Sequence, residues 1–583
     1  MAERLSAREA VALVTGGSPF TELTVPEREF KPDGPLEWQG YDASRARAAA
    51  RTGEAESVVC GHATVGDTPA VIVSFEFGFL GGSLGVRTGD RLEAAYTHAR
   101  EHRLPVVSLV ATGGSRMQEG MLALTQLQRV ARQSALTREA GLPQLAVVQD
   151  PTTGGGWATL GAGADVILAL PGAQIGFAGS RVRPADADPA AYTAEAQLAA
   201  GAVDAVVRPE DLGDTLALWL TLLTRPATAP APVPPALPSA DSDAGSGPAS
   251  ASAPEHVSAS AAAESGSGSG PAPASKHVPA SAAAESGSGS GSASGSGSAS
   301  AAAESGSGSG PAPASKHVPA SAAAESGSGP APASEHVSAS AAAESRSESR
   351  SGSASGSGPA APSPATPDGL PVTGWDAVLR ARAPERPRAQ AYLDAYFTRR
   401  AALSGDRCGG TDEGMLCGFG EHEGRTVAYA AQCGTATRPA GYRTAARLVR
   451  LAGRLGIPVL TLVDTPGAAN DADAERQGAG AAIADLFGAV ATARTPVTTL
   501  LIGEGGSGGA LALAAPGNTW ATPDSYFSVI APELAAAILK RPADQVRATA
   551  DHLHVRPQDL LALGVVRGIA GGPTGVTAPP RPG

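Results

Sequence analysis

A tract with almost no large apolar side chain divides this 583-residue chain and constrains its fold more than any other feature. Residues 226–370 consist mainly of Ala, Ser, Gly and Pro, and the pentapeptide AAAES recurs along them about every 20 residues. A repeat of that length can indicate a solenoid, but these units have no Leu, Ile or Phe to stack against a neighbour. Such a segment cannot offset the entropy of its own ordering. We interpret it as a long disordered tether.

The segments on either side, residues 1–225 and 371–583, mix apolar and charged residues. Each has roughly 200 residues, which is enough to bury a core. The sequence therefore predicts two folded domains, 1–225 and 371–583, joined by the linker 226–370.

The two domains repeat one layout. Each begins with two strands around a short turn, then has a helix, an apolar strand that runs into glycine, a second helix, a second strand that runs into glycines, and two final strands. The glycine-ended strands are PVVSLVATGG and PQLAVVQDPTTGGG in the first half, and PVLTLVDTPGA and PVTTLLIGEGGSGG in the second. Alternating strands and helices predict an α/β fold with a mainly parallel sheet in each half. Two copies predict a pseudo-dimer with a site between them.

The glycine turns are the candidate site. Without Cβ atoms they let backbone N–H groups approach a ligand closely, and the following helix adds unpaired donors and the positive end of its dipole. Two such turns could form an oxyanion hole for a thioester whose oxygen becomes negative. One turn alone would be explained as well by tight turning, but the recurrence in both halves favours a functional role.

Two other motifs overlap at the last turn. GGSGG at 505–509 fits the nucleophile elbow of a serine hydrolase, with Ser507 as nucleophile and Asp524, Asp551, His552 and His554 downstream. GEGGSG at 503–508 fits a dinucleotide-binding turn. Both patterns arise easily in glycine-rich sequence, so serine hydrolase is retained only as an alternative.

Charge and composition exclude several classes. A net charge of −12 argues against nucleic acid as a partner. The four cysteines form no CxxC pair, which indicates a reducing compartment and neither a disulfide framework nor a zinc site. The N-terminus does not read as a signal peptide, and no apolar run is long enough to span a membrane. We expect a cytoplasmic protein without metal.

Several motifs together resemble one family. SFEFGFLGGSLG, ATGGSRMQEG, DPTTGGG and IGFAGSRV resemble the β subunit of the bacterial acetyl-CoA carboxylase carboxyltransferase. GYRTAARLVRLAGRLGIPVLTLVDTPGA, LIGEGGSGGALAL and SYFSVIAPELAAAIL resemble its α subunit. The resemblance covers most of residues 55–210 and 415–570, and implies two domains of the ClpP/crotonase superfold in the order β then α.

The resemblance also implies a reaction and its site. In the family, the carboxyl group of N-carboxybiotin on a carrier protein is released as CO₂, and the enolate of acetyl-CoA attacks it to give malonyl-CoA for fatty acid biosynthesis. By carry-over, the catalytic N–H groups of Gly113 and Gly114 hold the enolate oxygen and those of Gly508 and Gly509 hold the ureido oxygen of biotin. The facing turns, assigned to substrate binding, are formed by Gly155, Gly156 and Gly467. Arg116 is placed either on a CoA phosphate or in a surface ion pair.

The chain departs from the family pattern at four places. The four-cysteine zinc ribbon of the β subunit is absent, the segment RPADADPAAYTAEAQ is shorter, DTPGAAND replaces DTPGAYPG, and AERQGA replaces AEERGQ. Substrate choice or rate could therefore differ, and a carboxyltransferase or decarboxylase for another acyl-CoA is an alternative, as is a scaffold that has lost activity. No Met-Lys dipeptide or P-loop occurs. The expected partners are thus a biotin carboxyl carrier protein and a biotin carboxylase, with the chain itself a homodimer or higher assembly.

Overall fold

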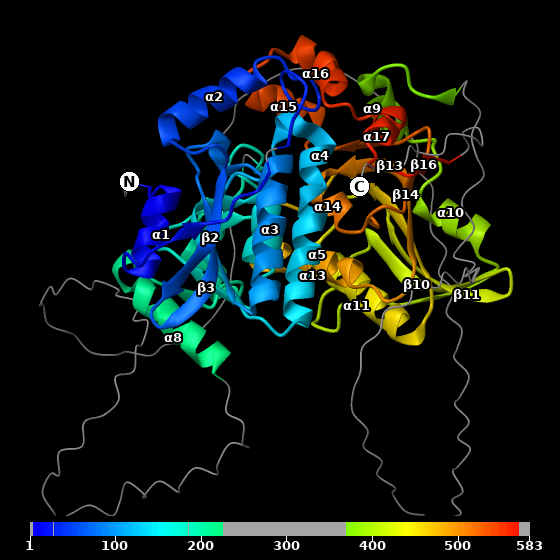
Figure 1. Cartoon of the computed structure of the whole chain (residues 1–583). Coiled ribbons are helices and arrows are strands. Elements are labelled where there is room, and N and C mark those ends of the chain that lie inside the picture. Colours follow the sequence, from blue (N-terminus) through cyan, green and yellow to red (C-terminus); the bar gives the residue numbers. More distant parts are fainter. Residues whose placement is uncertain (1–3, 27, 185, 226–368, 571–583) are drawn as a thin grey trace, which may run out of the picture. The chain divides into compact units, whose positions relative to one another are not determined.

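The computed structural model describes residues 4–26, 28–184, 186–225 and 369–570. It contains two eight-stranded sheets, one before and one after the central tract (Figure 1). The predicted linker, apart from Gly369 and Leu370, lies outside the described residues.

The first sheet has the strand order β1-β2-β3-β4-β5-β6-β8, with β7 paired to β5. Strand β2 is antiparallel to both of its neighbours, β1 and β3, and the pairings from β3 to β8 are parallel. This confirms the predicted hairpin followed by a parallel sheet. The strands are β1 (Thr21–Glu22), β2 (Val58–Val65), β3 (Thr68–Phe75), β4 (Val106–Thr112), β5 (Gln144–Thr153), β6 (Val166–Ala169), β7 (Ile175–Gly176) and β8 (Ala205–Val206).

Helices cover this sheet on both faces. They are α1 (Ala7–Thr15), α2 (Tyr41–Thr52), α3 (Val86–His102), α4 (Gly120–Leu124), α5 (Gln126–Glu139), α6 (Gly154–Gly156), α7 (Ala194–Ala199) and α8 (Leu212–Thr224). Helix α6 continues directly into one π-helical turn, η3 (Trp157–Gly161). Short 3₁₀ turns are η1 (Leu80–Gly82), η2 (Met117–Glu119), η4 (Pro189–Tyr192) and η5 (Pro209–Asp211).

The second sheet repeats the first strand for strand, in the order β9-β10-β11-β12-β13-β14-β16, with β15 paired to β13. The strands are β9 (Arg399–Ala402), β10 (Met415–His422), β11 (Arg425–Gln432), β12 (Val459–Thr465), β13 (Val497–Gly506), β14 (Thr519–Ala521), β15 (Tyr526–Ser528) and β16 (Gly568–Ile569). In each half the two late strands expected as a group both pair with the same long strand rather than with each other.

The helices of the second half are α9 (Gly374–Arg382), α10 (Ala389–Tyr396), α11 (Pro439–Leu455), α12 (Ala472–Arg476), α13 (Ala479–Ala491), α14 (Ser507–Leu511), α15 (Pro532–Ile538), α16 (Val546–His552) and α17 (Pro557–Ala562), with the 3₁₀ turn η7 (Ala543–Gln545). Helix α11 shows why they form here. Ala445, Leu448, Val449 and Ala452 are buried at helical spacing, while Arg450 on the opposite face is exposed.

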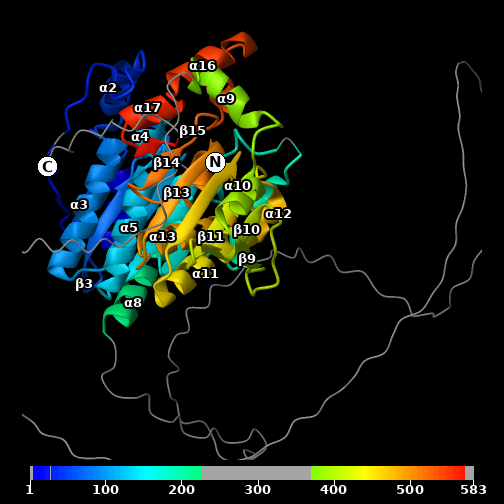
Figure 2. The ribbon, with the colours of Figure 1, turned by 90° about the vertical axis from the view of Figure 1, so that its right-hand side faces the viewer.

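One apolar core joins the two halves. It contains Leu127 and Val130 of α5 together with Ile483 and Leu486 of α13, all fully buried or nearly so. Figure 1 shows α3 and α5 between the strands of the first half and the helices α13 and α11 of the second, and Figure 2 gives the same elements from the side. The two sheets are therefore packed through helices that share a core, which brings their strand ends into one region.

Candidate active site

Four turns lie at the carboxyl ends of four parallel strands. In the first half β4 runs into Gly113–Gly114 and its neighbour β5 into Gly154–Gly156. In the second half β12 runs into Pro466–Gly467 and its neighbour β13 into Ser507–Gly509. Each half thus has two glycine turns at the ends of neighbouring strands, as the sequence predicted.

The registers of the two sheets show which turns correspond. Thr112 lies beside Thr152, and Thr465 lies beside Gly505, each after a register shift at the same place. Two turns also make the same kind of internal hydrogen bond. The N–H of Gly114 donates to Thr112 Oγ1 at 3.0 Å, and the N–H of Gly467 donates to Thr465 Oγ1 at 3.1 Å. Gly113–Gly114 therefore correspond to Pro466–Gly467, and not to Gly508–Gly509.

The other two turns correspond in the same way. Gly154 and Ser507 open their helices with positive φ angles of 65° and 55°. The next two residues, Gly155–Gly156 and Gly508–Gly509, lie in the first helical turn, where an N–H has no acceptor one turn earlier. The N–H groups of these four glycines therefore occupy equivalent positions in the two halves.

This geometry corrects the expected role of Gly113 and Gly114. The N–H of Gly113 donates to the carbonyl oxygen of Gly81 at 2.9 Å, and that of Gly114 is taken by Thr112. Both donors are already used inside the protein, so neither is free to hold an enolate oxygen. Their turn is a wall of the site, as a Cβ placed on Gly114 would lie 3.7 Å from Gly154 Cα.

The helix-opening turns of the two halves converge on one side chain. A Cβ on Gly508 would lie 3.5 Å from Cδ1 of Leu127 and 3.5 Å from Cζ of Phe177. A Cβ on Gly155 would collide with the methyl groups of the same Leu127. Turns that are more than 350 residues apart in the chain therefore flank a single leucine. Leu127 and Phe177 were not identified from the sequence, although Phe177 lies inside the motif IGFAGSRV.

Gly509 and Gly467 are close-packed against each other. A Cβ on Gly509 would lie 3.0 Å from the carbonyl carbon of Gly467 and 2.6 Å from Tyr442 Oη. The carbonyl oxygen of Gly509 accepts hydrogen bonds from Tyr442 Oη at 3.1 Å and from Gln432 Nε2 at 3.3 Å. Because no side chain fits there, glycine at 509 is required by packing as well as by any ligand.

Arg116 occupies neither of the two expected places. Its side chain is fully buried and pairs with two buried carboxylates, Glu56 and Glu119. It also donates to Tyr41 Oη at 3.2 Å and to the carbonyl oxygen of Ser83 at 2.7 Å. Burial alone would raise the pKa of Glu56, but the charge of Arg116 and its hydrogen bonds lower that pKa to about 2. Arg116 is therefore a structural ion-pair residue below the turn, and both the phosphate and the surface interpretation are wrong.

The structure does not assemble a hydrolase triad around Ser507. Among the described residues, no histidine or carboxylate makes a hydrogen bond with the Ser507 hydroxyl. His552 lies against Trp38 and its Nδ1 faces Arg541 at 3.2 Å, while Asp524 is exposed and lies 4.0 Å from Arg380. The positive φ of Ser507 reproduces the backbone of a nucleophile elbow without the partners that would activate it.

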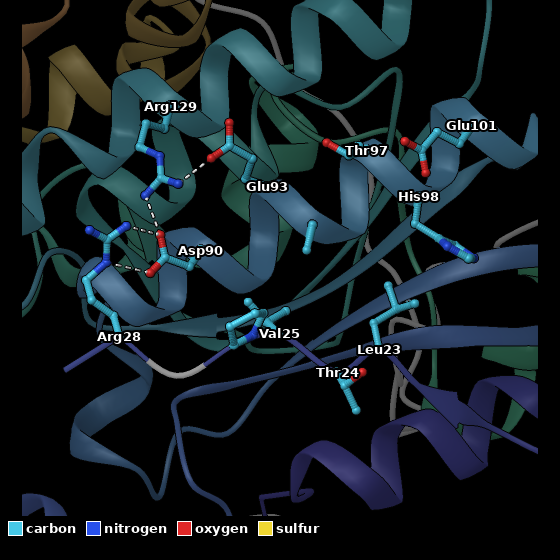
Figure 3. Close-up of a pocket in the computed structure, with 12 residues that line it drawn as sticks. Leu23, Thr24, Val25, Arg28, Asp90, Glu93, Thr97, His98, Glu101 and Arg129 are labelled. Atoms are coloured by element: carbon cyan, nitrogen blue, oxygen red, sulfur yellow. Dashed lines mark hydrogen bonds and ion pairs between the residues drawn. The ribbon is translucent and has the colours of Figure 1, made fainter. Parts of the chain in front are cut away.

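A surface groove of about 720 Å³ lies elsewhere, between residues 23–26 and Arg28 on one side and helices α3 and α5 on the other (Figure 3). Four of its charged residues pair with one another, since Asp90 accepts from Arg28 Nε at 3.0 Å and from Arg129 Nη1 at 3.0 Å, and Arg129 also pairs with Glu93. None of the turn glycines lines it. The groove is therefore separate from the candidate site.

Comparison with known proteins decides the family. Residues 23–230 match the carboxyl transferase domain, and residues 370–579 match the acetyl co-enzyme A carboxylase carboxyltransferase-like domain. An acetyl-coenzyme A carboxylase carboxyl transferase subunits beta/alpha protein of Salinispora arenicola is 32% identical over 97% of this chain and 81% of its own length. The chain belongs to the acetyl-CoA carboxylase carboxyltransferase family. It has the β and α parts fused in that order.

Other relatives agree with this carboxyltransferase assignment. The corresponding fused protein of a Parafrankia species is 32% identical over 98% of the chain and 79% of its own length. The separate α subunit of a Methylobacterium species is 44% identical over 35% of the chain and 68% of its own length. Within the ranges that the structure describes, there is no cluster of three His, Cys, Asp or Glu residues able to hold a metal ion, and no helix is long and apolar enough to cross a membrane.

Proposed function

We infer that this carboxyltransferase transfers a carboxyl group to acetyl-CoA and forms malonyl-CoA, as a component of a biotin-dependent acetyl-CoA carboxylase that serves fatty acid biosynthesis. Membership of the fused β/α family supports the reaction. The observation that carries the site is the convergence of the Gly154–Gly156 and Ser507–Gly509 turns on Leu127. A reaction between two ligands needs two binding turns that face one another, one from each half.

The two turns divide the work in this proposal. The N–H groups of Gly155 and Gly156 donate to the thioester oxygen of acetyl-CoA as it becomes negative. Those of Gly508 and Gly509 donate to the ureido oxygen of biotin. Preorganised N–H donors of this kind stabilise developing charge without reorganising during the reaction, and the loss of one typically costs about 10²–10³ in rate.

The residues of the second turn suit a flat ureido group. Gly508 has no side chain, its two nearest neighbours are the apolar groups of Leu127 and Phe177, and a Cβ there would stand in van der Waals contact with both. The space that a Cβ would fill is thus the space left for a ligand atom next to two backbone N–H groups. When bound, the carboxylated biotin supplies the carboxyl group.

The family assignment sets the expected partners. We propose that a biotin carboxyl carrier protein brings the biotin and that a biotin carboxylase loads it. We also propose that the chain assembles as a dimer or larger oligomer in the cytoplasm. The altered segments at 183–197 and 464–479 leave a carboxyltransferase or decarboxylase activity on another acyl-CoA as the alternative substrate assignment.

A direct assay tests the proposed function. Purified chain incubated with acetyl-CoA and a carboxylated biotin carrier should form malonyl-CoA. A parallel series with longer acyl-CoA substrates tests the alternative. Carboxylation of a longer acyl-CoA but not of acetyl-CoA would replace the proposed substrate, and absence of transfer to any of them would contradict the proposal.

Replacing Ser507 by alanine should change carboxyl transfer less than about tenfold, equivalent to roughly 1.4 kcal/mol of barrier. The hydroxyl has no activating partner among the described residues, and only the backbone of its turn is used. Steady-state transfer rates of the two proteins check this. A hydrolase that loses its nucleophile would instead fall by several orders of magnitude, so an esterase activity abolished by Ser507→Ala would overturn our interpretation.

A further inference from the structure

The two segments that depart from the family pattern contact each other across the halves. Tyr192 Oη donates to the carbonyl oxygen of Asn470 at 2.7 Å, Asn470 Nδ2 donates to the carbonyl oxygen of Val182 at 3.0 Å, and Arg476 pairs with Asp188 at 2.7 Å. We call this contact, between residues 174–184 and 186–192 of the first half and residues 470–476 of the second, the seam. The seam lies beside the Ser507–Gly509 turn, because the seam includes Phe177, whose ring is next to Gly508.

One carboxyl group in the seam is buried and makes no ion pair with any residue that the structure describes. Glu475 is 1% exposed, and its Oε1 accepts the N–H groups of Phe177 at 2.7 Å and Ala178 at 3.2 Å. Its Oε2 is buried and has no hydrogen-bond partner among the described residues. Burying a carboxyl group that accepts hydrogen bonds from only two backbone N–H groups costs folding free energy. We therefore expect Glu475 to have a role beyond packing.

The backbone that Glu475 holds carries a side chain of the site. Gly176 is pressed between Glu475 and Tyr192, since a Cβ on it would lie 3.0 Å from Glu475 Oε1 and 2.9 Å from Tyr192 Cδ1. The next residue is Phe177, whose ring packs against Gly508. A residue of the second half thus fixes a loop of the first half, and that loop returns a ring to the turn of the second half.

We propose that Glu475 is a positioning residue for carboxyl transfer, which holds Phe177 of the first half over the Gly508 turn of the second. The proposal rests on the proposed function, because it assigns Gly508 to the site. Nothing in it requires Glu475 to touch a substrate.

The surroundings of Glu475 make its contribution to the stability of the fold dependent on pH. Burial is the main cause that raises the pKa of Glu475 to about 7, with the two N–H groups and Arg183 opposing part of the rise and the charge of Asp471 adding a little to it. Arg183 itself lies over the Tyr192 ring, 3.7 Å from its centroid. Because the folded pKa exceeds the ordinary value of 4.5, folding takes up a proton between about pH 4.5 and 7. The contribution of Glu475 to stability therefore falls as the pH rises through that range.

Two variants and a matched control test the proposal. Glu475→Gln keeps an amide oxygen toward both N–H groups, so we expect transfer within about threefold of wild type. It should also raise the melting temperature at pH 8 more than at pH 6. Glu475→Ala leaves the two N–H groups unpaired and should lower kcat at least tenfold with little change in the KM for acetyl-CoA. Asp473→Asn, on the same helix but with an exposed side chain, should change neither kcat nor the KM for acetyl-CoA.

Amide hydrogen exchange gives a readout that does not depend on activity. The peptide containing Phe177 and Ala178 should exchange faster in Glu475→Ala and at the wild-type rate in Asp473→Asn. Phe177→Ala should slow transfer as Glu475→Ala does, and the double variant should be no slower than either. Unchanged exchange in Glu475→Ala, or effects that multiply in the double variant, would overturn the proposal. A wild-type protein without transfer activity would contradict the proposed function while leaving the exchange result to be judged by itself.

Discussion

Gly508→Ala should slow carboxyl transfer to acetyl-CoA about 100-fold in a protein that remains folded. The added methyl group would stand 3.5 Å from both Leu127 and Phe177, which is ordinary contact, and the φ of Gly508 lies outside the left-handed region. The methyl would fill the space beside the N–H groups that we assign to biotin, and the loss of such donors costs about 10²–10³ in rate. The measurement is steady-state transfer, with thermal unfolding recorded on the same samples.

The decarboxylation of malonyl-CoA without biotin separates the two halves. It depends on the Gly155–Gly156 turn in our assignment, so Gly508→Ala should leave it nearly unchanged. Gly488→Ala on α13 is the matched control, since a Cβ there meets nothing within 4 Å. An equal fall of both activities would contradict the division of labour. Valine at Gly509 or Gly114 would be a poor test, because the first collides with backbone and the second has a φ of 101°.

Glu56→Ala should lower the free energy of unfolding by about 3–5 kcal/mol, because it removes the principal partner of the fully buried Arg116. Denaturant unfolding measures the change. Adding Arg116→Met should restore part of the loss, since an apolar side chain of similar length replaces the guanidinium that Glu56 no longer neutralises, and Glu119 keeps its hydrogen bonds from Tyr41 Oη and the N–H of Val86. Glu37→Ala, which breaks the exposed pair with Lys31, should have a much smaller effect. Equal losses in Glu56→Ala and the double variant would contradict the ion-pair explanation.

The same pair gives stability a dependence on acid. The pKa of Glu56 in the folded protein is about 2, below its ordinary value of 4.5. The contribution of this carboxylate is therefore complete above about pH 4.5 and is lost as the pH falls toward 2. In Glu56→Ala this part of the acid dependence should disappear.

The sequence predicted the elements and their order because they depend on local patterns. The two strands around the GDTP turn and the helix over Pro439–Leu455 follow from alternating and helical spacing of apolar residues. The duplication then predicted neighbouring glycine turns. The family resemblance correctly added the order of the β and α parts.

The hydrogen-bond and ion-pair partners of the site residues could not be predicted, because those partners are distant in the chain. Gly113 donates to Gly81, Arg116 pairs with Glu56, and Glu475 accepts from Phe177, 298 residues away. A glycine in a turn motif looks the same whether its N–H is free or bonded. Only the sheet register showed that Gly155–Gly156 are the counterparts of Gly508–Gly509.

The shared core of α5 and α13 and the seam both lie within one polypeptide. When such contacts join separate subunits, their occupancy falls on dilution and depends on how much of each subunit is made. In a fused chain the two halves are always synthesised in a ratio of one to one, and their docking is a first-order event that protein concentration does not change. A polar contact such as that of Glu475 can then be weak enough to respond to pH without releasing half of the enzyme.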